Sequence, residues 1–138
     1  MVILMVGLIT EEAQKELLDK LVEYYKRLYP GIEFEISDVE LSHEELGELF
    51  YTHPGEEIEA TAAEKIRAIE EAIGGGYNTP IVVLKSGDKN LILDGHRRAR
   101  VAYSQGLGWK AHIITPKKEG IEFGIEDMIL GKISDLFD

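Results

Sequence analysis

The segment of residues 80–106 constrains the fold of this chain most strongly. Two apolar runs, residues 80–84 and 91–93, are separated by Ser86-Gly87-Asp88, which is typical of a tight turn. The first run is rich in β-branched residues, which favour strands. A helical pattern then runs from residue 95 or 96 to its expected end at Gly106. We therefore expect a β-hairpin that leads directly into a helix.

Capping residues mark the starts of further helices. Thr10 precedes an amphipathic stretch that runs to Pro30, and two glutamates follow Thr10 directly. Ser42 and Thr61 are each followed three residues later by a glutamate, which is the capping-box spacing. The glycines at 74–76 should end the helix after Thr61, because glycine adopts the left-handed conformation at little cost. The short helix after Ser42 is expected to reach residue 50, and a last amphipathic helix is expected over 125–137.

Further strands are expected over residues 2–9, 33–41 and 111–114. The apolar run 2–9 is far shorter than the roughly 20 residues of a membrane span, so it is interpreted as a buried strand. A length of 138 residues with 44% hydrophobic side chains suits one domain with one core. The sequence thus predicts a single α+β domain with a small mixed or antiparallel sheet flanked by helices.

Composition narrows the classes of partner. The net charge is −11, from 26 acidic and 15 basic side chains, so the long-range field repels polyanions and disfavours binding of DNA or RNA. The absence of cysteine excludes disulfides, thiolate metal sites and thiol nucleophiles, and it suits a reducing cytoplasm. No membrane association is expected. Abundant Lys and Glu with few Asn and Gln are typical of heat-adapted proteins.

The expected chemistry lies at Asp94-Gly95-His96-Arg97-Arg98, where a strand ends and a helix begins. The first amide groups of a helix and its dipole attract an anion. Gly95 removes the side chain that would keep a phosphate from the backbone. Arg97 or Arg98 could clamp the phosphate oxygens, and His96 supplies a donor of adjustable charge. This junction is therefore predicted to bind phosphate.

An alternative interpretation needs no ligand. The arginines could form a solvated helix face that pairs with surplus acids, while Asp94 caps the helix. Asp94 as the cap is compatible with both interpretations, although its charge opposes phosphate binding unless a cation or Mg²⁺ lies between them.

The residues Pro80-Ile81-Val82-Val83, Leu91 to Arg100 and Gly106 resemble the ParB/sulfiredoxin-like superfamily, whose members read P-I-x-V, hairpin, G-x-[HR]-R, helix. That family includes the N-terminal domain of ParB partition proteins, sulfiredoxin and the archaeal free serine kinases. The resemblance covers roughly residues 32–115. It leaves a strand-helix extension at 1–30 and the helix over 125–137 outside the family core.

The resemblance implies a nucleotide whose phosphates are held by Gly95, His96, Arg97 and Arg98. Asp94 and Thr79 are taken with them as cofactor-binding candidates. Gly95 stands where a sulfiredoxin has its cysteine, so sulfinic acid reduction by that route is excluded. The residues after Thr115 are too few for a helix-turn-helix, so centromere binding is not expected.

The nearest likeness is to the archaeal free serine kinase branch, whose motif reads D-G-H-H-R, with Arg97 here in place of the second histidine. Its histidine-glutamate element has two counterparts, His43-Glu44-Glu45 and His53-Pro54-Gly55-Glu56-Glu57. Glu57, Glu56 and Glu44 are therefore the candidates for a general base on a substrate hydroxyl. A structural alternative is that such glutamates only complement the helix dipole.

Three functions follow as hypotheses. The first is a domain that binds ADP, ATP or CTP, with Mg²⁺, and acts as a phosphotransferase on a small hydroxyl-bearing substrate or as a nucleotide hydrolase. The second is a non-catalytic module in which the nucleotide orders residues 74–78 or a homodimer contact. The third, a ParB-like nuclease acting on DNA, is disfavoured by the acidic balance and by the lack of a metal cluster in the sequence.

Overall fold

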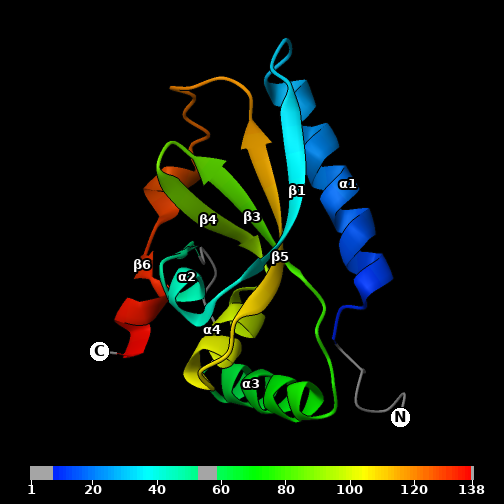
Figure 1. Ribbon diagram of the computed structural model, residues 1–138, viewed down its shortest axis with the longest axis vertical. Helices are drawn as coiled ribbons and strands as arrows, with labels where there is room; N and C mark the ends of the chain where they lie inside the picture. Colours follow the sequence, from blue (N-terminus) through cyan, green and yellow to red (C-terminus); the bar gives the residue numbers. More distant parts are fainter. Residues whose placement is uncertain (1–7, 53–58, 138) are drawn as a thin grey trace.

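A six-stranded mixed sheet organises the molecule, and its strand order is β1-β5-β3-β4-β2-β6 (Figure 1). The computed structural model describes residues 8–52 and 59–137, with the side chains of 59–63 left aside. The strands are β1 (Phe34–Leu41), β2 (Phe50–Tyr51), β3 (Ile81–Ser86), β4 (Lys89–Asp94), β5 (Trp109–Pro116) and β6 (Gly131–Lys132). β1 with β5, β3 with β4 and β2 with β6 pair antiparallel, whereas β3 with β5 and β2 with β4 pair parallel.

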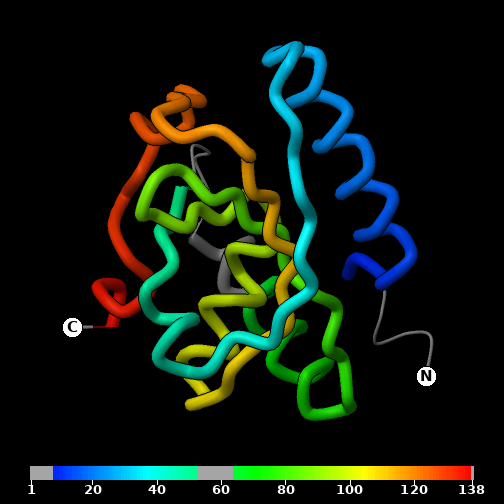
Figure 2. Tube along the Cα trace, turned by 45° about the horizontal axis from the view of Figure 1, so that its top comes forward, coloured from blue at the N-terminus to red at the C-terminus, as the bar shows by residue number. Residues whose placement is uncertain are grey.

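Four α-helices and two 3₁₀ turns surround this sheet within the described part of the chain. They are α1 (Glu11–Leu28), α2 (His43–Gly47), α3 (Glu59–Gly74), α4 (His96–Ser104), η2 (Ile125–Met128) and η3 (Ile133–Phe137). In Figures 1 and 2, α1 lies beside β1, while α3 and α4 lie together at the lower end of the molecule. The expectation of a mixed sheet flanked by helices is thus confirmed. None of the helices in the described residues is long and apolar enough to cross a membrane.

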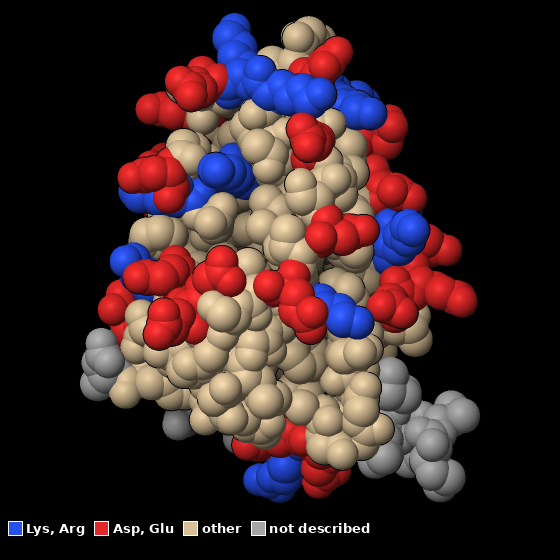
Figure 3. Space-filling view, viewed as in Figure 1, with Lys and Arg blue, Asp and Glu red and all other residues tan. Residues whose placement is uncertain are grey.

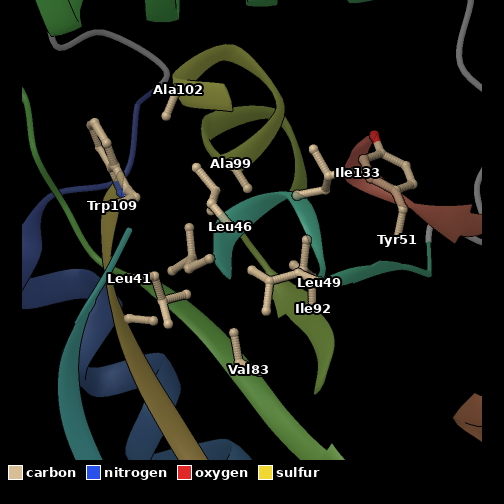
Figure 4. Close-up of a cluster of buried hydrophobic side chains, with 12 residues drawn as sticks. Leu41, Leu46, Leu49, Tyr51, Val83, Ile92, Ala99, Ala102, Trp109 and Ile133 are labelled. Carbon is tan, nitrogen blue, oxygen red and sulfur yellow. The ribbon is translucent and has the colours of Figure 1, made fainter. Parts of the chain in front are cut away.

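The strand β3 is buried because both faces of the sheet are covered there. Ile81 and Val83 point into a cluster with residues of α2 and α4, including Leu46 and Ala99, part of which Figure 4 shows. Val82 and Leu84 point the other way, against the apolar face of α1. Residues 81–84 are fully buried. Such a strand has an unbroken apolar sequence, which explains the strong signal at 80–84.

The local expectations that depend on caps and turns are confirmed. Thr10 caps α1 by accepting from Ala13 N, and Ser42 forms a reciprocal capping box with Glu45. The turn between β3 and β4 places Gly87 at φ +63°. Gly76 adopts φ +101° just after α3, and the expected strands at 33–41 and 111–114 correspond to β1 and β5.

Several boundaries differ from the sequence expectations. The prediction of a C-terminal helix over 125–137 is wrong, because η2 and η3 are single turns separated by β6. In β6, Gly131 has a φ of +144° and pairs with Tyr51 of β2. The helix after Ser42 ends at Gly47, because the aromatic pair Phe50–Tyr51 joins the sheet instead. Thr61 is not a cap, since α3 is already helical at Glu59. Of the strand expected over 2–9, residues 2–7 lie outside the described residues, and Leu8 and Ile9 belong to no strand.

Candidate functional site

A pocket of about 430 Å³ lies at the start of α4. Its walls come from the segment before α1, from α3 and the residue Tyr77 after it, and from the junction of β4 with α4. The polar lining residues in the described part of the chain are Glu64, Lys65, Tyr77, Asp94, His96, Arg97 and Arg98. The apolar ones are Leu8, Ile9, Ala68 and Ile69. Gly95, which has no side chain, also lines the pocket. The structure therefore brings together five of the predicted site residues, 94–98, in one pocket.

Gly95 is required by the backbone and by packing. It adopts φ +96° and ψ 24°, the left-handed conformation that lets β4 turn directly into α4. An added Cβ would lie 2.5 Å from Ile81 Cγ2 and 2.5 Å from Arg98 Nη2. Glycine at position 95 is therefore required by the fold itself, whether or not a phosphate binds there.

The start of α4 has no side-chain cap. Gly95, not Asp94, is the N-cap residue, so the expected role of Asp94 as a cap is wrong. The first hydrogen bond of the helix runs from Ala99 N to Gly95 O at 3.0 Å. The amides of residues 96–98 precede this ladder and are not used by it, which gives the pocket wall the positive end of a helix dipole.

Arg98 lies inside the protein and not on a solvated face. It is 4% exposed, and its Nη2 donates to Gln14 Oε1 at 2.6 Å and to Asp94 Oδ2 at 3.3 Å. Its Nη1 donates to the Tyr77 hydroxyl at 3.2 Å. The solvated-face interpretation is thus wrong for Arg98. The expected role as a phosphate clamp is also weakened, because both terminal nitrogens already bind protein groups. Arg98 instead ties α1 and the loop after α3 to α4.

The hydrogen bonds of His96 define which ring nitrogen carries its proton. The Thr52 hydroxyl donates its only proton to Ile92 O at 2.6 Å. Its oxygen, 3.2 Å from His96 Nε2, must then accept from that nitrogen. In the neutral ring the lone pair is therefore on Nδ1. The Tyr51 ring meets His96 edge-on with centroids 4.8 Å apart, which fixes the orientation of the imidazole.

The pocket lining is locally positive in an acidic molecule. Among the described lining residues, Lys65, Arg97 and Arg98 supply three positive charges, and Glu64 and Asp94 supply two negative ones. The chain as a whole has a charge of −11, and Figure 3 shows acidic side chains scattered over the viewed face, with basic ones among them. The described lining residues therefore carry one net positive charge, in contrast to the acidic chain as a whole.

The other predicted site residues are not brought to this pocket. Glu44 is exposed on α2 and lines a separate depression with Tyr103. Thr79 is 4% exposed, and its hydroxyl donates to Ile9 O at 3.2 Å, so it supports the pocket wall without lining it. Glu56 and Glu57 lie outside the described residues.

Three polar residues of the lining, Glu64, Lys65 and Tyr77, are not among the residues predicted from the sequence, nor are the four apolar ones. The capping-box spacing gives Glu64 only a structural role, and no sequence pattern gives Lys65 or Tyr77 a role in the site. The available signal was helical spacing: residues 64, 65, 68 and 69 share one face of α3, and that face lines the pocket. The face could be recognised from the sequence, but its partner α4 could not.

The comparisons with known proteins leave the family open. No protein-family model, no curated protein and no solved structure matched the chain.

Proposed function

We propose that this pocket binds the phosphate groups of a nucleotide such as ADP, ATP or CTP. Lys65, Arg97 and the amides at the start of α4 would contact the phosphates, with His96 as a further donor when it is protonated. The observation that carries the proposal is the meeting of two cationic side chains with a helix N-terminus in one pocket of a strongly acidic chain. The pocket volume of about 430 Å³ suits a ligand of this size.

Arg97 provides the first test of nucleotide binding. Loss of one charge-assisted contact typically costs about 1.5–3 kcal/mol, so Arg97→Ala should weaken binding at least roughly tenfold. The measurement is calorimetric titration with ADP, ATP and CTP, each with and without Mg²⁺. Arg100→Ala is the matched control, because Arg100 is on the same helix but does not line the pocket. Equal affinities of the two variants, or no binding of any nucleotide to the unaltered protein, would contradict the proposal.

The catalytic form of the proposal is a phosphotransferase with a small hydroxyl-bearing substrate, or a nucleotide hydrolase. Glu64 supports it, because this carboxylate lines the pocket beside Lys65. It could take the proton from a substrate hydroxyl or from water as that oxygen bonds to the terminal phosphorus; the bond from this phosphorus to the bridging oxygen then breaks, and the shortened nucleotide leaves with that oxygen. Asp94 is less suited to this role, since its Oδ2 accepts from Arg98.

A conservative change at Glu64 separates catalysis from binding. Glu64→Gln should keep nucleotide affinity within about threefold and lower turnover by roughly 100-fold or more. Phosphorus NMR of the products, with serine and glycerol as trial acceptors, measures this directly. Glu70→Gln, at an exposed position of α3 outside the pocket lining, is the control. Full turnover in Glu64→Gln would exclude Glu64 as the base, and binding without turnover in the unaltered protein would favour the regulatory module.

A ParB/sulfiredoxin-like identity of the fold is part of the same proposal. It is supported by the order of hairpin, Asp94-Gly95-His96-Arg97 and helix, which the structure contains as β3, β4 and α4. Arg97 replaces the second histidine of the kinase-like motif, and this replacement is compatible with phosphate binding because arginine binds phosphate through charge-assisted hydrogen bonds.

A further inference from the structure

The pocket at α4 has an apolar lining as well as a charged one. Ala68 and Ile69 lie about one helical turn, roughly 5.4 Å, along α3 from Glu64 and Lys65. Leu8 and Ile9, which precede α1, line the same pocket. Both segments offer methyl groups beside the cationic residues. A ligand that fills the pocket would therefore need an apolar portion next to its charged portion.

The wall formed by Leu8 and Ile9 is held in place by buried side chains. The Tyr77 hydroxyl donates to Ile9 O at 2.8 Å, and the Thr79 hydroxyl donates to the same oxygen at 3.2 Å. Tyr77 and Thr79 are 8% and 4% exposed. A carbonyl with two buried donors has a fixed position, so this wall is already formed before any ligand binds. Preformed walls lower the entropy cost of binding.

Arg98 connects this wall to the charged part of the pocket. Its Nη1 donates to the Tyr77 hydroxyl, and its Nη2 donates to Gln14 Oε1 in the first turns of α1. Gln14 is fully buried, although its Nε2 makes no hydrogen bond within the described part of the chain. Arg98 lines the pocket, and its buried Nε likewise has no hydrogen-bond partner among the described residues. Unsatisfied buried donors destabilise a fold. The network nevertheless connects α1, Tyr77 and α4 beside the pocket.

From these contacts we infer that Leu8 and Ile9 are part of the ligand site and receive the nucleoside portion of the ligand. Lys65 and Arg97 hold its phosphates. This inference rests on the proposed nucleotide site and makes it more specific: the ligand class is a nucleoside phosphate, and free inorganic phosphates bind more weakly. Leu8 and Ile9 precede α1 and lie outside residues 32–115, the part of the chain with the family resemblance. They would then determine the preference for nucleoside phosphates over inorganic phosphates.

The test compares a nucleotide with a ligand that has only phosphates. Leu8→Ser should lower the affinity for ADP and for CTP roughly tenfold, which is the usual effect of removing an apolar contact from a binding pocket. The same change should leave the affinity for inorganic pyrophosphate unaltered. Leu28→Ser is the control, because Leu28 is on α1 and does not line the pocket. Calorimetry on the full chain provides all the affinities, and thermal melts without ligand show whether each variant folds.

A second variant keeps the inference testable if Leu8→Ser alters the fold. Ala68→Phe adds a ring to the half-buried apolar lining on α3, so it should block nucleotides and still admit pyrophosphate. Equal weakening of nucleotide and pyrophosphate, or unaltered nucleotide affinity in both variants, would overturn the inference. If the unaltered protein binds pyrophosphate as tightly as ADP, the proposed phosphate site is supported, but the inference that Leu8 and Ile9 bind the nucleoside is wrong. If neither ligand binds, the proposed function itself fails.

Discussion

Gly95 is the residue on which the turn from β4 into α4 depends. Two separate costs oppose any side chain there: the left-handed backbone at φ +96°, and the approach of Ile81 and Arg98 to the place of a Cβ. Gly106, just beyond α4, has only the first of these costs, with φ +76° and no atom within 4 Å of an added Cβ. A comparison of substitutions at these two glycines therefore distinguishes the cost of backbone strain from the cost of overpacking.

We expect Gly95→Ala to destabilise the protein by about 2–4 kcal/mol, the sum of left-handed strain and overpacking. Gly106→Ala, which has only the strain, should cost about 1 kcal/mol. Urea unfolding followed by circular dichroism gives both values. Equal effects at the two positions would show that the contacts with Ile81 and Arg98 relax without cost.

The contiguous part of the site could be predicted from the sequence, and its other parts could not. Residues 94–98 are adjacent in the chain, so a strand ending in glycine with basic residues behind it is visible directly. Lys65 reaches the same pocket only because α3 packs on α4. The burial of Arg98 depends on Gln14, 84 residues earlier, which no local pattern can pair with it. A site formed by neighbouring residues can be recognised from the sequence, whereas these contacts arise from tertiary packing.

The short turn η2 is attached to the sheet by Glu126. Its carboxylate accepts from Ser86 Oγ at 2.5 Å and from Phe123 N at 2.9 Å. Burial raises the pKa of Glu126, but the hydrogen bonds from Ser86 and from backbone amides outweigh burial and hold the pKa below its usual value. The ionised carboxylate thus joins η2 to the end of β3.

A lowered pKa in the folded state has a definite consequence for stability. The contribution of Glu126 is complete above the pKa of the unfolded chain, and it is lost as the pH falls through the lower pKa of the folded state. Glu126→Gln should therefore destabilise the protein near pH 7 and reduce the fall of the Tm with acid. Melts from neutral to acidic pH measure both effects. Glu122→Gln, at an exposed neighbouring position, should match the unaltered protein. An acid response of Glu126→Gln identical to that of the unaltered protein would refute the assignment.

Helix starts and turns could be predicted where residues close in the sequence determine them. The caps at Thr10 and Ser42 and the turn at Gly87 act within four residues, and the structure contains all three. The segment 125–137 has a helical apolar pattern, yet Gly131 pairs with Tyr51 and the amide of Ile133 donates to Leu49 O. Those bonds with the distant segment around β2 compete with helical ones. The strand order of the sheet is likewise a property of pairings between distant segments, which periodicity does not specify.

The charge of the whole molecule acts against its compactness. With a net charge of −11 distributed over 138 residues, acidic side chains repel one another across the surface. Among the described residues, the ion pairs of Lys117 with Glu33 and of Lys132 with Glu48 lie at exposed positions, where such pairs contribute little. We therefore expect a net repulsion between acidic side chains at the surface, which these exposed pairs offset only weakly.

Screening this repulsion should stabilise the protein. Between about 0.01 M and about 0.15 M NaCl the Debye length falls from roughly 30 Å to roughly 8 Å, which removes most interactions across the molecule. We expect the Tm to rise by about 2–4 °C for each kcal/mol of repulsion relieved. Calorimetric melts over this range of salt, in the absence of nucleotide, measure the change. A Tm that falls with salt would mean that exposed ion pairs dominate instead.

The position of α1 on the sheet also determines the order in which the protein can be assembled during synthesis. Leu18, Val22 and Tyr25 pack on Val82, Leu84 and Ile114, all of which belong to the second half of the chain. While only the first half of the chain has been synthesised, α1 therefore exposes its apolar stripe to water, and exposed apolar surface of this kind is prone to aggregation. The pocket at the start of α4, one wall of which is attached to α1, would be among the last features of the nascent protein to form.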